Sequence, residues 1–472
     1  MDEPEKHAEF GGRIVMLGFG SIGQAILPLL FRHIELRPEQ VRIISRSPDR
    51  SGIAAQYEVE FQALPLTESN YQSVLEGAVR EGDFLLNLSV EVASLELIRY
   101  CWRHNVLYLD TCIEPWPGSY DSPQRTLSQR SNYALREAVL AFRLDKRNGA
   151  TAVVTQGANP GLASAFVKQA LLAMAAGQDI APGRPACYED WAALARQLDI
   201  KAIHIAERDT QLSSRRKQRD EFVNTWSVSG FVSEGLQPSE LGWGSHERHW
   251  PDDACRHGYG CDAAIYLQRP GIATRVRSWT PLEGPYHGFL VTHGESISIA
   301  DHLTLRERGE VVYRPTVHYA YYPCDDAVLS LHEIAGRNWR LQRGRRIMRE
   351  EIESGMDELG VLLMGNRKGV FWYGSRLTIE QARALAPHNS ATSLQVAAGA
   401  LGGMVWAMRH PRAGVVEPDD IDYELVLRIA APYLGQLVGE YGDWSPLKDR
   451  SPLYEEAVDG SDPWQFLNFR VG

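Results

Sequence analysis

The stretch RIVMLGFGSIGQAILPLL, residues 13–30, decides the fold prediction. An apolar, strand-like run leads directly into a Gly-x-Gly-x-x-Gly pattern, formed by Gly18, Gly20 and Gly23, and a helix-like segment follows at once. In a first βαβ unit, Gly18 permits a tight turn, Gly20 lets the backbone approach a pyrophosphate, and Gly23 lets helix and strand pack closely. The stretch therefore predicts a dinucleotide-binding turn, and a glycine turn that binds no dinucleotide is the alternative.

The first 156 residues continue this alternation of strand-like and helix-like segments. The strand-like runs are 13–18, 41–45, 84–89, 106–110 and 151–156, and the helix-like segments between them include 23–33 and 93–104. Such alternation predicts a parallel sheet with helices on both faces. We therefore expect an α/β protein whose residues 1–156 form a Rossmann-type, doubly wound parallel sheet.

Beyond residue 156 the pattern changes to many strands and few helices. One long helix-like segment, 161–177, precedes strand-like runs at 201–207, 223–234, 262–268, 287–299 and 310–322, and then a hairpin at 360–377. This pattern predicts a second, α+β domain over residues 157–385. Residues 388–410 indicate a helix rich in small residues that Asn389 or Ser390 can cap, within a C-terminal segment, 386–472, that we expect to return to the first domain.

Composition limits the possible partners and compartments. The chain of 472 residues has a formal net charge of −11, which argues against nucleic acid or an anionic membrane as the main partner. Its 6 cysteines lie far apart without a C-x-x-C pair, which favours reduced thiols over disulfides or a zinc site. No signal peptide and no apolar run of roughly 18–20 residues is evident. We expect a soluble, cytoplasmic protein without a bound metal.

The choice between NAD and NADP stays open at this stage. An NAD enzyme usually ends its second strand with Asp or Glu, which binds the ribose hydroxyls. Here the strand ends in IISRS, which provides Ser45, Arg46 and Ser47. Arg46 could instead receive a 2′-phosphate.

Isolated acids in apolar or strand-like settings are the next informative residues. Glu91 and Glu114 each follow a predicted parallel strand, where ligand contacts gather. Glu207 shares strand parity with apolar neighbours and would continue a buried face, and the parity of His293 and Glu295 would place an imidazole beside a carboxylate. Each has an ordinary alternative as a solvated rim residue, a salt-bridge partner or a hydrogen-bonded core histidine.

If these acids converge, they suit an amine. Trp226 and Glu234 would lie about 26 Å apart on an unbent strand, so they could share a pocket only if the chain turned near Ser229-Gly230. Several carboxylates beside an indole would bind an alkylammonium, because the acids neutralise its charge and the ring adds a cation–π contact of about 0.5–2 kcal/mol. A carboxylate-bearing substrate would need Arg or Lys close to Glu114, and none flanks it closely. The residues alone indicate a nicotinamide oxidoreductase that acts on amines.

Several longer motifs carry a family resemblance. They are LGFGSIGQAILPLL, LDTCIEPW, GANPG, IHIAERDTQ, NTWSVSGFVSEG and THGESISIADHL. Together and in this order, the chain resembles the bacterial homospermidine synthases, a family of saccharopine-dehydrogenase-like Rossmann enzymes. The resemblance implies an NAD-dependent, redox-neutral condensation of two putrescines to sym-homospermidine and ammonia, with spermidine as an alternative aminobutyl donor. It also implies a homodimer in which residues 157–385 provide substrate binding and dimerisation.

The same resemblance implies roles for individual residues. Glu207 and Asn159 would hold the reacting amine, and Glu114 would hold the distal ammonium. Trp226 would guard the entrance by cation–π contact, and Glu234 would attract polyamines at the mouth. His293 with Glu295 would assist proton transfer. The residues implied around NAD are Gly18, Gly20, Ser21, Ile22, Gly23, Ser45, Arg46, Glu91, Thr111 and Asn159.

Three alternatives remain open from the sequence. A saccharopine-type or carboxynorspermidine-type dehydrogenase would share the fold but consume external NAD(P)H and need a basic clamp for its substrate. A non-catalytic, NAD-dependent sensor would bind polyamines without making product. Within the synthase reading, Lys201 lies on the same predicted strand face as Glu207, so it could form an enzyme-bound imine.

Overall fold

The computed structural model describes residues 5–120, 122–145, 148–180, 183–450 and 456–472, and the chain divides into two compact units. Unit 1 consists of Met1–Pro123, Ala134–Leu162 and Ile379–Leu434. Unit 2 consists of Gln124–Tyr133, Ala163–Thr378 and Gly435–Gly472. This division differs from the expected boundaries, because residues 124–133 and 435–472 group with unit 2 and residues 379–385 group with unit 1.

Unit 1 is built on a seven-stranded sheet in which every ladder is parallel. The strand order is β24-β8-β7-β6-β2-β4-β5. The bounds are β2 Ile14–Leu17, β4 Val41–Ser45, β5 Glu60–Ala63, β6 Phe84–Asn87, β7 Leu107–Asp110, β8 Ala152–Val153 and β24 Val415–Val416. The predicted Rossmann-type parallel sheet is confirmed, and β24 adds an edge strand from a distant part of the sequence.

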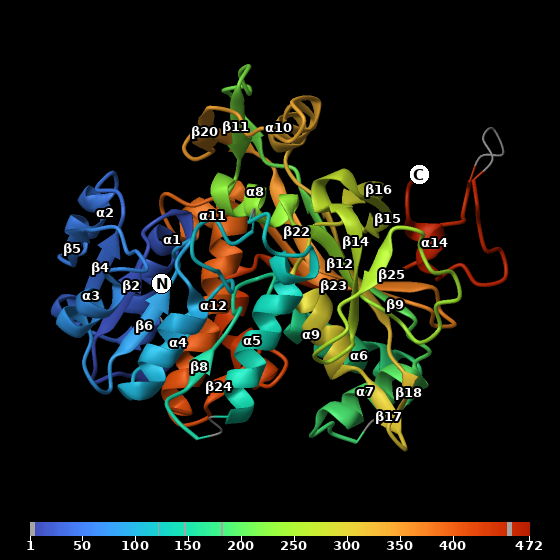
Figure 1. Ribbon diagram of the computed structural model, residues 1–472, viewed down its shortest axis with the longest axis horizontal. Helices are drawn as coiled ribbons and strands as arrows, with labels where there is room; N and C mark the ends of the chain where they lie inside the picture. Colours follow the sequence, from blue (N-terminus) through green and yellow to red (C-terminus); the bar gives the residue numbers. More distant parts are fainter. Residues whose placement is uncertain (1–4, 121, 146–147, 181–182, 451–455) are drawn as a thin grey trace. The chain divides into compact units, whose positions relative to one another are not determined.

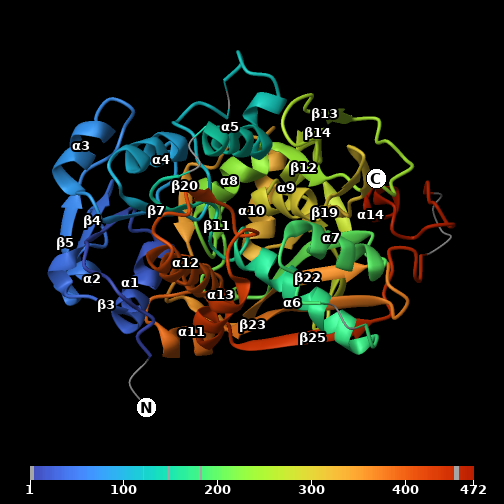
Figure 2. The same ribbon diagram turned by 90° about the horizontal axis from the view of Figure 1, so that it is seen from below.

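Helices cover both faces of this sheet (Figures 1 and 2). On one face, α3, α4 and α5 contribute Leu75, Leu97 and Val139 to an apolar cluster with the strands. Figure 2 shows α1 and α12 on the opposite face, where they pack against each other. The bounds are α1 Ser21–His33, α2 Ser51–Gln56, α3 Tyr71–Ala78, α4 Ser94–Arg103, α5 Asn132–Asp145, α11 Ile379–Leu385, α12 Ala391–Arg409 and α13 Tyr423–Ala430, and a small parallel pair joins β1 Ala8–Glu9 to β3 Ile34–Glu35.

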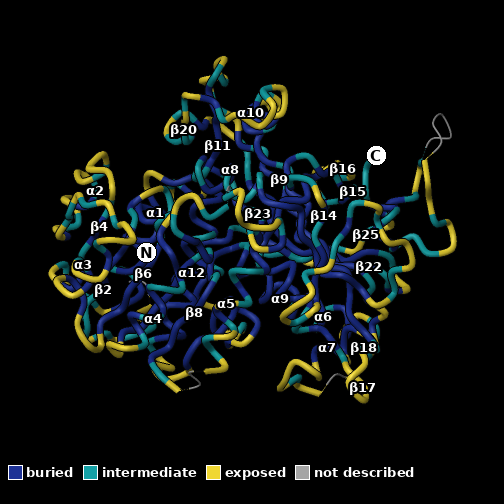
Figure 3. The backbone as a smooth tube through the Cα atoms, in the orientation of Figure 1, coloured by how far each residue is buried: buried dark blue, intermediate teal, exposed yellow. Residues whose placement is uncertain are grey.

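The helix α12 is the buried centre of one face (Figure 3). Its first turn is capped by Ser390, whose side-chain oxygen accepts the Ser393 N–H at 3.1 Å. A Cβ on Gly399 would collide with the carbonyl oxygen of Gly157, so the helix backbone lies directly against the 157–161 loop. By length and composition α12 could cross a membrane, but 89% of that window is buried inside the protein, which identifies it as a core helix.

Unit 2 is built on a ten-stranded mixed sheet. The main path is β13-β14-β12-β19-β9-β22-β23-β25, with β16 joining β15 to β19. At its centre β9 runs parallel to β19 and antiparallel to β22, and β22 and β23 form the predicted hairpin. The bounds are β9 Ala202–Asp209, β12 Pro238–Gly242, β13 Ala254–Arg256, β14 Ala264–Pro270, β15 Arg275–Thr280, β16 Gly284–Phe289, β19 Thr316–Tyr322, β22 Met356–Met364, β23 Val370–Thr378 and β25 Gln436–Gly442.

The two faces of this sheet have different coverings. On one face, α9 packs on β12 and β19, and the ring of Phe166 on α6 packs edge-on against Tyr373 at 5.7 Å. On the other face, β15 crosses β9 and β22, and Phe469 of α14 joins an apolar cluster with Trp372. The remaining bounds are α6 Leu162–Gly177, α7 Tyr188–Gln197, α8 Val228–Leu236, α9 Gly294–His302, α10 Asp325–Gly336, α14 Phe466–Phe469, β10 Leu212–Ser213, β11 Glu221–Asn224, β17 Leu305–Glu307, β18 Glu310–Tyr313, β20 Gly344–Ile347 and β21 Ile352–Ser354.

Two predicted strands are wrong. The run 223–234 ends as a strand at Asn224 and becomes α8, whose N-cap Ser227 accepts the Gly230 N–H at 3.0 Å. The run 287–299 leaves β16 at Phe289 and becomes α9. Short apolar runs fit helix and strand equally well, and local capping decides between them.

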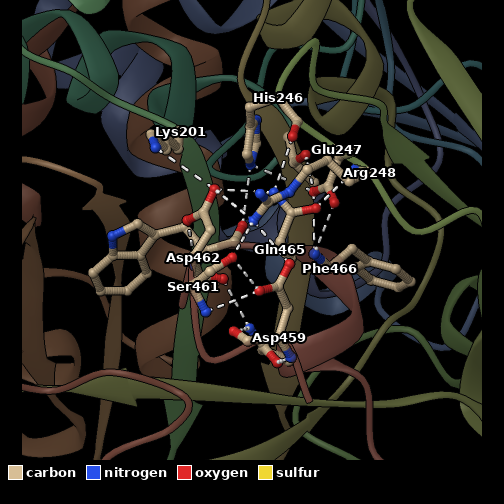
Figure 4. A network of polar contacts seen from close by, with 12 residues as sticks. Lys201, His246, Glu247, Arg248, Asp459, Ser461, Asp462, Gln465 and Phe466 are labelled. Atoms are coloured by element: carbon tan, nitrogen blue, oxygen red, sulfur yellow. Dashed lines mark hydrogen bonds and ion pairs between the residues drawn. The ribbon is translucent and has the colours of Figure 1, made fainter. Parts of the chain in front are cut away.

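The last seventeen described residues are fastened to unit 2 by a buried polar network (Figure 4). The Glu247 carboxylate accepts the Thr316 hydroxyl at 2.5 Å and the Phe466 N–H at 2.9 Å, at the start of α14. Burial raises the pKa of Glu247 to about 7, although these donors act in the opposite direction. Asp462 pairs with Lys201 Nζ at 3.6 Å. The C-terminal segment is therefore an integral part of this unit.

The contact between α12 and the 157–161 loop predicts that Gly399→Ala destabilises the protein. The added methyl group overpacks a site with no space, which typically costs about 1–3 kcal/mol. Gly77→Ala on α3 is the matched control, because a Cβ there meets nothing within 4 Å and the change should stabilise the helix by about 0.5–1 kcal/mol. Urea unfolding measures both free energies, and equal effects of the two variants would contradict the packing argument.

Candidate functional site

The glycine turn of unit 1 has the geometry of an anion-binding loop. Gly18 follows β2 with a φ of 86°, and a Cβ there would lie 2.7 Å from the Leu88 carbonyl oxygen. A Cβ on Gly23 would lie 2.9 Å from the Gly18 carbonyl oxygen, whereas one on Gly20 would meet nothing within 4 Å. Gly20 is also the N-cap of α1 and has no side chain to cap it. The first N–H groups of α1, at Ser21 and Ile22, therefore face an open approach at the positive end of the helix dipole.

A charged pair lies at the same sheet edge, after β4 and β6. The Arg46 guanidinium donates to the Glu91 carboxylate at 3.2 Å, and both side chains are about half exposed, at 61% and 48%. Ser45, the last residue of β4, is partly buried. Arg46, which could accept a phosphate, is thus already paired with an acid.

The ends of β7 and β8 carry the other predicted residues of unit 1. Asp110 accepts the Thr155 N–H at 2.6 Å and the Tyr108 hydroxyl at 2.8 Å, and burial raises the pKa of its carboxyl group to about 7. Thr111 follows Asp110 directly in the sequence. Glu114 comes three residues later and is buried, with 5% of its surface exposed. The backbone N–H of Glu114 donates a hydrogen bond to the hydroxyl oxygen of Ser94 at 3.0 Å.

Asn159 lies in the loop between β8 and α6, where its peptide bond to Pro160 is cis. The loop is closed by the Gly157 N–H, which donates to the Pro160 carbonyl at 2.7 Å. The side chain of Asn159 is partly buried. This loop is the one against which α12 packs, so helix packing fixes the backbone that carries Asn159.

In unit 2 an imidazole lies between two carboxylates. His293 is the N-cap of α9, and its Nδ1 lies 3.1 Å from Glu295 in the first turn of that helix. Its Nε2 lies 3.2 Å from Glu234 on α8. Burial acts to lower the pKa of His293, but Glu295 and Glu234 together raise it to about 10. His293 and Glu295 were predicted to be adjacent on one face of a strand. They are adjacent instead because both lie at the N-terminus of α9.

Tyrosines connect this imidazole to the other predicted residues of unit 2. Tyr319 on β19 donates its hydroxyl hydrogen to the buried Glu207 carboxylate, and its ring packs on His293 at 4.4 Å. It stacks on Tyr321 at 5.1 Å, and Trp226 donates its indole N–H to the Tyr321 hydroxyl at 3.1 Å. Glu207, Trp226 and His293 therefore belong to one continuous cluster.

The structure brings together all five residues that were predicted for unit 2. They are Glu207, Trp226, Glu234, His293 and Glu295. Tyr319 and Tyr321 were not predicted from the sequence, although their alternation in TVHYAYY was the available signal. Glu114, Asn159 and the glycine turn lie in unit 1 and are described there.

Lys201, the candidate for a covalent imine, is engaged elsewhere. It precedes β9, whereas Glu207 lies near the other end of that strand, which places their backbones about 20 Å apart. Its ammonium pairs with Asp462 of the C-terminal segment. Its contacts are those of the network in Figure 4 and not of the His293 cluster.

The cluster contains one acceptor that the described residues leave open. Glu295 Oε2 is buried and accepts no hydrogen bond from the described part of the chain. A buried acceptor without a donor typically costs about 1–3 kcal/mol. An N–H donor from a ligand would remove this cost.

Comparisons with known proteins extend over the full chain. The model of the saccharopine dehydrogenase NADP binding domain matches residues 14–153, and that of the saccharopine dehydrogenase C-terminal domain matches residues 157–443. A homospermidine synthase of Blastochloris viridis is 51% identical over 100% of this chain and 99% of its own. One from Mesorhizobium japonicum is 47% identical over 98% of this chain and 97% of its own.

A solved structure is similar in both sequence and fold. The crystal structure of the homospermidine synthase from Legionella pneumophila in complex with NAD has a TM-score of 0.92 and 48% identity. The match covers 98% of each chain.

The charged neighbours of His293 predict how it titrates. Its pKa of about 10 in the folded protein exceeds the ordinary value of 6.5, so the imidazolium stabilises the fold fully below about pH 6.5 and this contribution is lost as the pH rises through 10. Glu295→Gln should lower the pKa of His293 by at least about one unit, measured by NMR of labelled imidazole. Glu307→Gln is the control, because the side chain of Glu307 lies in the same unit, pairs with Arg196 and is 63% exposed. An unchanged pKa of His293 in Glu295→Gln would contradict the conclusion that Glu295 raises this pKa.

Proposed function

Because the chain belongs to the homospermidine synthase family of saccharopine-dehydrogenase-like enzymes, we propose that it condenses two putrescines into sym-homospermidine and ammonia. Spermidine would serve as a second aminobutyl donor. The observation that carries the proposal is the cluster of Glu207, Glu234 and Glu295 around His293, with a buried carboxylate oxygen of Glu295 open to a donor. Such a site suits an alkylammonium, which supplies both positive charge and N–H groups.

The glycine turn supports NAD as the cofactor of this proposal. The open approach at Gly20 and the uncapped N-terminus of α1 suit a pyrophosphate. The Glu91 carboxylate beside Arg46 would accept hydrogen bonds from ribose hydroxyls and repel a 2′-phosphate, which favours NAD over NADP. When bound, NAD supplies a reversible hydride acceptor, so the hydride taken from one amine-bearing carbon can return to the condensed imine and the net reaction is redox-neutral.

The predicted acids and the imidazole would provide charge and protons for the amine. A free alkylamine titrates near pH 10.4, so it must lose a proton before hydride can leave its carbon. Glu207 with Asn159 would hold this reacting amine, and Glu114 would hold the distal ammonium. His293 has a pKa of about 10, so at neutral pH it is an imidazolium that can donate a proton to departing ammonia. Trp226 would add a cation–π contact, and Glu234 would attract the polyamine.

We also propose that the protein is a cytoplasmic homodimer. None of the 6 cysteines in the described part of the chain forms a disulfide, which suits a reducing compartment. The dimer follows from the family resemblance carried by the motifs of the sequence.

The direct test is product formation. Incubation of purified protein with isotope-labelled putrescine and catalytic NAD⁺ should give labelled homospermidine and ammonia, detected by mass spectrometry. Absorbance of NADH should show no net change, because each hydride is returned. Steady consumption of reduced cofactor would instead indicate an imine-reducing dehydrogenase of the saccharopine type, and binding of putrescine without product would indicate a sensor.

The acid assignments predict the behaviour of one conservative variant. Glu114→Gln removes the charge but keeps the shape, so kcat/KM for putrescine should fall by about ten- to hundredfold, the equivalent of one charged hydrogen bond. Steady-state kinetics with labelled putrescine measure the change. Glu440→Gln, at a 44% exposed position of unit 2, is the control. Unchanged putrescine kinetics in Glu114→Gln would remove Glu114 from the substrate site.

A further inference from the structure

A second buried carboxylate lies close to the His293 cluster in unit 2. Glu240 on β12 is fully buried and accepts hydrogen bonds from three directions. The backbone N–H groups of Asn132 and Tyr133, at the start of α5, donate to it at 2.9 and 3.3 Å. The hydroxyl group of Thr292 donates to it at 2.5 Å.

This carboxylate is linked to His293 through one residue. Thr292 directly precedes His293, and its hydroxyl oxygen also accepts a hydrogen bond from the side chain of Asn132 at 3.3 Å. The hydroxyl group is therefore oriented by a donor on one side and by Glu240 on the other. The backbone that enters His293 is fixed in the same way, just before α9 begins at Gly294.

Stability alone does not explain a glutamate at this position. A buried carboxylate is costly unless its hydrogen bonds are made, and an apolar replacement of similar shape is often at least as stable. His257 lies beside Glu240, with its Nε2 3.3 Å from the carboxylate but without a hydrogen bond to it, and its ring stacks on Tyr133 at 3.8 Å. The hydrogen bonds that Glu240 accepts from Asn132, Tyr133 and Thr292 fix its geometry, and the residue next to Thr292 is His293.

We propose that Glu240 is a positioning residue of the reaction, which acts through Thr292 to hold the His293 imidazole between Glu234 and Glu295. Its role rests on the proposed function, in which His293 donates a proton. Glu240 itself touches neither substrate nor cofactor in this proposal. The groups that face the imidazole are Glu234 from α8, Glu295 from α9 and Tyr319 from β19.

The protein contains a matched control for this arrangement. Glu247 also caps a helix N-terminus, at Phe466, and also accepts a buried threonine hydroxyl, from Thr316 at 2.5 Å. That network fastens the C-terminal segment (Figure 4). Thr292→Val and Thr316→Val thus delete the same kind of hydrogen bond in the same unit, and only the first bond adjoins His293.

The kinetic test compares these two variants with Thr292→Ser, which keeps the hydroxyl group. We expect kcat for homospermidine formation to fall about tenfold in Thr292→Val, the equivalent of one buried hydrogen bond, with KM for putrescine changed less than about threefold. Thr292→Ser should restore kcat, and Thr316→Val should lower only the melting temperature. Equal kcat values in Thr292→Val and the wild type, or equal losses in both valine variants, would overturn the proposal.

A titration of His293 gives a second measurement that does not depend on activity. NMR of labelled imidazole in the full-length protein should show the His293 pKa shifted down by about one unit in Thr292→Val and in Glu240→Gln, because the ring is held less well between its carboxylates. An unshifted titration in both folded variants would overturn the proposal. Absence of homospermidine with the wild-type protein would refute the proposed function, and the titration would still decide whether Glu240 positions His293.

Discussion

The architecture of unit 2 depends on one constraint, that a carboxylate removed from water must be hydrogen-bonded or neutralised. Three buried glutamates of unit 2 meet it in different ways. Glu207 accepts a tyrosine hydroxyl, Glu295 lies against an imidazolium, and Glu247 caps α14. The constraint is only partly met at Glu295, where one buried carboxylate oxygen accepts no hydrogen bond from the described residues. The polar interior thus connects the stability of the fold with the type of ligand.

The same constraint explains why His293 is so basic. Its imidazole is surrounded by acids that would otherwise repel each other, so its protonation relieves more free energy than burial costs. In a reaction that begins and ends with amines, a proton donor near pH 10 is well matched to its substrate. In the proposed function, charge balance in the buried cluster would serve both amine binding and proton supply.

The features that were predicted correctly are those that a local sequence pattern indicates without ambiguity. The glycine turn, the parallel strands of unit 1 and the β22–β23 hairpin carry unambiguous signals of period and turn chemistry. The strands predicted at 223–234 and 287–299 became helices beyond Asn224 and Phe289, because their apolar spacing fits both structures and the helix starts after Ser227 and His293 were not recognised. Tyr319 and Tyr321 were missed because aromatic residues in a strand are more often core. Contacts such as Thr292 with Glu240 join residues far apart in sequence, and no local pattern encodes them.

The interleaved course of the chain has a consequence for its synthesis. Unit 1 needs α12 and β24 to cover its sheet and extend its edge, and these elements follow more than two hundred residues of unit 2. Unit 2 in turn needs β25 and α14, which come last. Unit 1 cannot reach its full core before β24, at Val415–Val416, has been synthesised, and unit 2 cannot before α14, at Phe466–Phe469. Both units are therefore completed late in translation. The strands of unit 1 stay partly uncovered until α12 and β24 have been synthesised.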